Sequence, residues 1–75
     1  MTLGEIIKST RTKTFLSQEA FATELKVSIA TINRWENSKA KPNITAMSKL
    51  KDFCHNHNIP FENIEAEWLR DSKEV

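Results

Sequence analysis

Residues 17–37, SQEAFATELKVSIATINRWEN, constrain the fold of this chain more than any other stretch. Ser17 is a good helix N-cap, and no glycine or proline follows it up to Leu25, so this segment predicts a short helix. A second cap, Ser28, begins another uninterrupted segment that ends near Asn37. Two helices of about two turns each are marginal alone in water. The segments before and after them must therefore cover their apolar faces.

The second of these helices has two different faces. At about 100° per residue, Ile32 and Trp35 point to one side, with Glu36 on its flank. The opposite side is polar or small and has no apolar positions to bury, so it is available to a partner. Its members are Ala30, Asn33, Arg34 and Asn37.

Three further helices are expected around this pair. The first spans residues 2–12, the fourth begins after the Asn43 cap and ends at 55–58, and the fifth follows a turn at 59–61. Their predicted apolar positions are Leu3, Ile6 and Ile7; Ile44, Met47, Leu50 and Phe53 or Cys54; and Phe61, Ile64, Trp68 and Leu69. The sequence thus predicts a single all-α domain over residues 1–70, followed by a polar tail at 71–75.

In this order and spacing, several segments resemble the Cro/repressor-type helix-turn-helix family. They are Ser17-Gln-Glu, Ala22, Leu25, Val27-Ser28, Ile32 and Arg34-Trp-Glu-Asn37, followed by Lys39-Ala-Lys-Pro42. The resemblance extends from about Leu3 to about Ile64. It implies a compact five-helix, lambda-repressor-like DNA-binding domain that places the helix starting near Ser28 in the DNA major groove.

The resemblance also implies roles for individual residues. The base-reading side chains are expected to be Ser28, Ile29, Ala30, Asn33 and Arg34. Arg34 can donate two hydrogen bonds to guanine, and the small or apolar residues allow close approach to a thymine methyl. The phosphate contacts are expected at Gln18, Asn37, Lys39 and Lys41. Arg11 and Glu36 match a pair of charges that joins the first helix to the third.

The charge distribution agrees with DNA binding by the middle part of the sequence, although the net charge of the chain is only +1. Residues 26–51 carry six basic side chains against one acidic one, whereas residues 52–75 carry two basic against six acidic. The basic block coincides with the proposed recognition helix and the loop after it. An acidic fifth helix is better kept away from phosphate.

Two positions depart from the family pattern. Lys26 lies in the turn between the paired helices, where a left-handed backbone is expected, and Ser38 stands where the family often has glycine. Left-handed backbone costs a non-glycine residue about 1–2 kcal/mol. We therefore expect local strain at Lys26 and altered geometry after Asn37.

Other functional classes find little support. Cys54 is the only cysteine, and it and two nearby histidines cannot supply the four convergent ligands of a structural zinc site. We expect no enzyme activity, cofactor, metal or small-molecule ligand. With no long apolar run, we expect neither a membrane span nor export, and a lone thiol suits the cytoplasm.

The functional prediction is a sequence-specific transcriptional regulator, more often a repressor, that binds a two-fold-symmetric double-stranded operator as a homodimer. The self-association surface is expected at Phe61, Ile64, Trp68 and Leu69. Two alternatives remain open: an antitoxin or restriction-modification controller built on the same module, and an adaptor that binds only protein.

Overall fold

A computed structural model describes residues 1–71 of the chain, which contain five helices and no strand. The helices are α1 (Leu3–Lys13), α2 (Gln18–Leu25), α3 (Ile29–Glu36), α4 (Ile44–Asn56) and α5 (Glu62–Asp71). This confirms the all-α prediction. Residues 72–75, most of the expected tail, lie outside the described part, and Asp71 is the last residue of α5.

Side-chain caps start each of the first four helices. Ser17, Ser28 and Asn43 accept a hydrogen bond from the backbone N–H three residues later, at the starts of α2, α3 and α4. At the start of α1, Thr2 and Glu5 form a reciprocal capping box. These caps satisfy amide groups that have no partner inside their own helix.

Left-handed residues end the same four helices, and none of the four is glycine. They are Phe15, Lys26, Ser38 and Asn58, with φ between 57° and 60°. Lys26 thus has the expected left-handed conformation. After α2, α3 and α4, the residue that follows the left-handed one donates its backbone N–H to the carbonyl five residues before it. This hydrogen bond gives a carbonyl at the end of the helix a partner.

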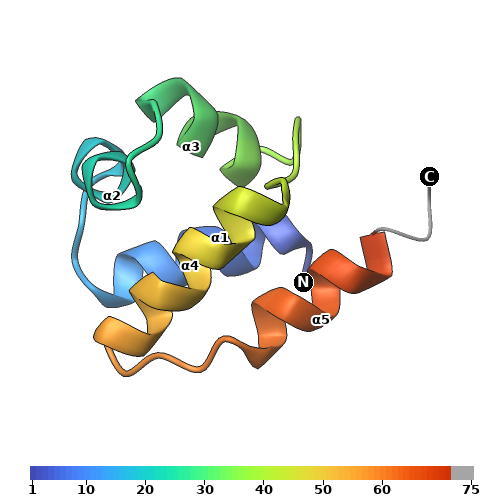
Figure 1. The fold of residues 1–75 in the computed structure, drawn as a ribbon. Coiled ribbons are helices and arrows are strands. Elements are labelled where there is room, and N and C mark those ends of the chain that lie inside the picture. The colour runs from blue at the N-terminus through green and yellow to red at the C-terminus, as the bar shows by residue number, and fades with distance from the viewer. Residues whose placement is uncertain (72–75) are drawn as a thin grey trace.

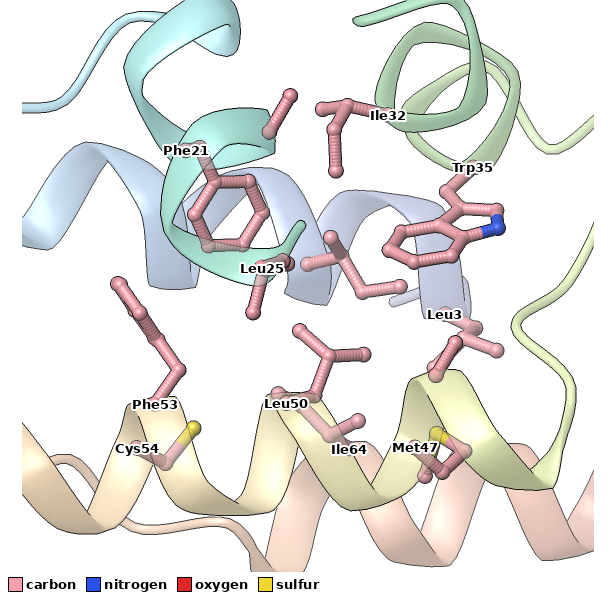
Figure 2. Close-up of a cluster of buried hydrophobic side chains, with 13 residues drawn as sticks. Leu3, Phe21, Leu25, Ile32, Trp35, Met47, Leu50, Phe53, Cys54 and Ile64 are labelled. Atoms are coloured by element: carbon pink, nitrogen blue, oxygen red, sulfur yellow. The ribbon is translucent and has the colours of Figure 1, made fainter. Parts of the chain in front are cut away.

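The hydrophobic core lies between α4 on one side and the pair α2 and α3 on the other (Figure 1). Residues of α1 and α5 also contribute to it. Figure 2 shows Phe21, Ile32 and Trp35 directed toward Leu50 and Phe53 across this interior. Phe21 and Phe53 meet edge to face, with ring centroids 5.0 Å apart. The helix-turn-helix pair is therefore buried against α1 and α4, as its short length requires.

Two isoleucines differ from the expected arrangement. Ile44, predicted to face inward, is 75% exposed because it is the first residue of α4, ahead of the buried Ala46 and Met47. Ile64, predicted at a self-association surface, is 1% exposed and packs in the monomer's core. Ile64 is therefore not available for the self-association contact predicted from the sequence.

The single glycine permits a close helix crossing. A Cβ atom on Gly4 would lie 2.5 Å from the carbonyl oxygen of Trp35 and 3.0 Å from that of Glu36. Both are backbone atoms, which cannot rotate away. Gly4 therefore lets the start of α1 approach the end of α3, the helix proposed to face DNA.

Candidate nucleic-acid interface

The turn before α3 is fixed from two sides. Ser28 caps α3 by accepting from the Thr31 amide at 3.1 Å. In the same turn, Lys49 of α4 donates its Nζ to the Lys26 carbonyl at 3.4 Å. These contacts hold the orientation of α3 relative to α2, so the outer face of α3 projects in one direction.

The two faces of α3 are separated as the sequence predicts. Ile32 and Trp35 are 0% and 4% exposed. The residues proposed to read bases all lie on the exposed side: Ser28, Ile29, Ala30, Asn33 and Arg34. Ile29 is unusual among them because half of an isoleucine side chain is left in water. An exposed apolar group beside an arginine suits a surface that must contact thymine methyls as well as hydrogen-bonding base edges.

An ion pair joins α1 to the end of α3. Arg11 donates its Nε to Glu36 Oε2 at 2.6 Å and its Nη2 to Glu36 Oε1 at 3.0 Å, while its Nη1 donates to the Leu16 carbonyl at 2.8 Å. The Arg11 and Glu36 side chains are 12% and 3% exposed. The hydrogen bond to Glu36 raises the pKa of Arg11, against the opposing effect of burial. This pair is the one that the resemblance implied.

A chain of amide side chains extends from the same carboxylate. Gln18 donates its Nε2 to Glu36 Oε1 at 2.9 Å. Asn33 donates to Gln18 Oε1 at 3.4 Å, and Asn37 donates to Asn33 Oδ1 at 3.1 Å. The sequence reasoning treated these three amides as separate DNA contacts and missed their connection. The spacing of Asn33 and Asn37, four residues apart on one helix face, was the one available signal.

The loop after α3 carries the remaining predicted phosphate contacts. Lys39 is exposed. Lys41 is also exposed, but its Nζ donates to the Trp68 carbonyl at 3.2 Å and lies 5.0 Å from the Trp68 ring centroid. Lys41 therefore links the loop to α5 through a cation–π contact. This engagement makes Lys39 the better candidate for phosphate.

On another side of the molecule, α4 and α5 form an apolar groove. Its floor contains Met47 and the partly buried Phe61 and Trp68, and its edges carry Ile44 and Leu69, which are 75% and 53% exposed. Trp68 also donates its indole N–H to the Pro42 carbonyl at 2.6 Å. Three of the four residues predicted for self-association thus line one groove, joined by the unpredicted Ile44.

Within residues 1–71, no three His, Cys, Asp or Glu side chains are grouped so that they could hold a metal ion. None of the described helices is long and apolar enough to cross a membrane.

Comparison with known proteins gives one match. A family model described as helix-turn-helix matches residues 7–54, from the middle of α1 almost to the end of α4. The match includes all the proposed base-reading and phosphate-contact residues. No curated protein and no solved structure matches the chain significantly.

Proposed function

The chain belongs to the helix-turn-helix family of DNA-binding regulators, and we propose that it is a sequence-specific transcriptional repressor that inserts α3 into the major groove. The observation that carries this proposal is the outer face of α3. That face is solvent-exposed along its length and combines Ser28, Ile29 and Ala30 near its start with Arg34 one turn later. Small or apolar residues at the start of the helix and an arginine one turn later suit base readout.

Affinity comes from a second set of residues. Lys39 lies in the basic loop after α3, and Gln18 lies at the first position of α2, where free amide groups and the helix dipole favour a phosphate. Contacts of this kind set the position of the protein on the duplex without reading its sequence. Asn37 and Lys41 complete the proposed phosphate set, with Lys41 limited by its contact with Trp68.

We further propose that the protein acts as a homodimer in the cytoplasm, on an operator with two-fold symmetry. One domain offers one recognition helix, and two copies would read half-sites about 34–36 Å apart. The α4–α5 groove is the proposed self-contact, through Phe61, Trp68, Leu69 and Ile44. Lys51 and Glu65 at the groove add complementary charges that a two-fold contact can pair.

Selection of bound duplexes from a random DNA pool, followed by a binding series at several salt concentrations, tests the proposal. Arg34→Ala should weaken binding to the best duplex by about 1–3 kcal/mol and remove preference at one base position. Lys39→Ala should weaken binding to selected and scrambled duplexes alike and lower the salt slope by about 0.9. Lys8→Ala, at an exposed position of α1, serves as the charge control.

Equal weakening of both duplexes by Arg34→Ala would show that Arg34 contacts phosphate instead of bases. Failure of the wild type to enrich any sequence would reject sequence-specific binding.

A second function is favoured by one observation, the apolar groove itself. A different protein could occupy it, which would make the chain a controller or antitoxin-type regulator whose DNA-binding module also binds a partner. The wild type would then sediment as a monomer at all concentrations.

A further inference from the structure

Amide side chains at α2 and α3 form a series of hydrogen bonds that ends at a carboxylate. That end is the Glu36 carboxylate, which accepts hydrogen bonds from two Arg11 nitrogens and from Gln18 Nε2. Beyond Gln18, the chain continues through Asn33 to Asn37. Glu36 is 3% exposed, whereas Asn33 and Asn37 are exposed to solvent. The chain thus connects a buried charge to the surface that faces DNA.

The chemistry of the end group determines the orientation of every amide after it. A carboxylate between arginine donors can only accept, so Gln18 must turn its NH₂ group toward Glu36. Its carbonyl oxygen then faces Asn33, which must offer an NH₂ group in turn. The Asn33 oxygen is left facing Asn37, which again donates. Each amide taken alone could be turned by 180° at little cost, but together they have one consistent arrangement.

We propose that Glu36 is a positioning residue for DNA recognition: it sets the donor–acceptor direction of Gln18, Asn33 and Asn37 without contacting DNA itself. The reading part of this inference rests on the proposed DNA-binding function. In the fixed direction, Gln18 and Asn33 each keep one N–H for an outside acceptor, such as a phosphate oxygen or a base-edge oxygen. Asn37 keeps its second N–H, which suits a phosphate oxygen, together with its carbonyl oxygen for an outside donor.

Replacement of Glu36 by glutamine keeps the shape of the side chain, but one of its two acceptor oxygens becomes an NH₂ donor. In Glu36→Gln, an amide oxygen in the place of Oε1 would still accept from Gln18, but the new NH₂ group would oppose the Arg11 Nε–H. The reversed amide would accept from Arg11 Nε and donate to Gln18, which would turn the three amides around. Each arrangement contains one opposed donor pair, so neither is strongly preferred. Glu36→Gln should therefore mix the two directions.

Arg11→Lys is the matched control. It also disrupts the paired contact between α1 and α3, because lysine cannot make two parallel hydrogen bonds. It leaves Glu36 as an acceptor, however, so the direction of the amides should persist. Comparing the two variants separates loss of stability from loss of direction.

The first measurement needs no DNA. Scalar couplings across hydrogen bonds, measured by NMR on the isotope-labelled full chain, should connect the Gln18 side-chain nitrogen to the Glu36 carboxyl carbon and the Asn37 side-chain nitrogen to the Asn33 carbonyl carbon. Both couplings should persist in Arg11→Lys and weaken or disappear in Glu36→Gln. Their absence in the wild type, or their survival at full size in Glu36→Gln, would overturn the proposal.

The second measurement is selection from a random duplex pool. Glu36→Gln should bind the wild-type selected duplex about tenfold more weakly and select altered bases, whereas Arg11→Lys should select the wild-type bases. Identical preferences for Glu36→Gln and wild type would make Glu36 purely structural and overturn the proposal. If the wild type selects no sequence, the proposed function fails, while the NMR couplings still decide the direction of the amides.

Discussion

Two sides of this molecule meet water in opposite ways. Where α1, α2 and α3 converge, a buried ion pair and a series of amides bond to one another, and the outward-facing groups keep a defined geometry. Between α4 and α5, apolar side chains are left uncovered, with Ile44 and Leu69 more than half exposed. The first side holds its shape by internal hydrogen bonds. The second would be stabilised by being covered.

This difference matches the two kinds of recognition proposed above. A helix that reads base edges benefits from side chains whose donors and acceptors are already oriented, because ordering them on binding costs free energy. An apolar groove needs little orientation and contributes mainly through the area it buries. Charge follows the same division, since the α3 region is basic and α5 is acidic.

The largest expected effect concerns the ion pair on the first side. Arg11→Ala and Glu36→Ala should each lower the free energy of unfolding by about 3 kcal/mol, because each leaves a poorly hydrated charge without its partner. The double variant should lose about 2 kcal/mol less than the sum. Urea denaturation measures all three.

The exposed pair between His57 and Glu24 supplies the control cycle. Its side chains are 32% and 46% exposed, so its coupling should stay below about 1 kcal/mol. Strict additivity in the Arg11–Glu36 cycle would show that the pair does not hold α1 to α3.

The sequence predicted the first side better than the second, for a physical reason. The two faces of α3 follow from helical periodicity alone, and the Arg11–Glu36 pair followed from a family resemblance. On the second side, Ile44 and Ile64 exchanged their expected places, because periodicity marks an apolar stripe without saying which neighbouring helix covers it. Ile44 precedes the covered turns of α4, whereas Ile64 is packed into the core.

Long-range contacts mark the limit of the sequence reasoning even on the first side. Gln18 and Glu36 are 18 residues apart, and no local pattern indicates that their side chains touch. A glycine in the first turn of a helix shows no local pattern that marks it as important, yet the missing side chain of Gly4 sets the crossing of α1 and α3. Both depend on the packing of helices, which spacing within one helix does not reveal.

Gly4→Ala tests that crossing. In a solvent-exposed helical position this change usually stabilises a protein by about 0.5–1 kcal/mol. Here the new Cβ would lie 2.5 Å from the Trp35 carbonyl oxygen, so α1 must move away from α3. We expect a loss of about 1–3 kcal/mol in urea denaturation. Because the two effects have opposite signs, a gain in stability would rule out the close approach.

Leu69→Lys tests the second side. Leu69 is 53% exposed, so the stability of the monomer should change by no more than about 0.5 kcal/mol. Self-association, measured by sedimentation, should weaken at least about tenfold, or 1.4 kcal/mol. Leu69 is preferable to Trp68 for this test, because Trp68 also makes contacts inside the monomer.

Ile29→Lys is the matched control on the first side, since Ile29 is exposed to a similar extent, 50%. It should leave self-association unchanged and alter the selected DNA sequence. A wild type that remains monomeric at every concentration would assign the α4–α5 groove to a different protein.

The smallest effects should come from the left-handed residues, three of which lie at the α1–α2–α3 side. Phe15→Gly, Lys26→Gly and Ser38→Gly should each raise the free energy of unfolding by about 0.5–1 kcal/mol, because relief of the left-handed strain exceeds the extra entropy of the unfolded chain. Each should therefore raise the melting temperature by a few degrees, at about 4–8 °C per kcal/mol. The Phe15 ring is 95% exposed, so its removal loses no burial.

Asn58→Gly, before α5, should gain less, since asparagine tolerates this conformation better than other residues. Equal gains in stability at all four positions would show that the left-handed residues of the α1–α2–α3 side are no more strained than Asn58.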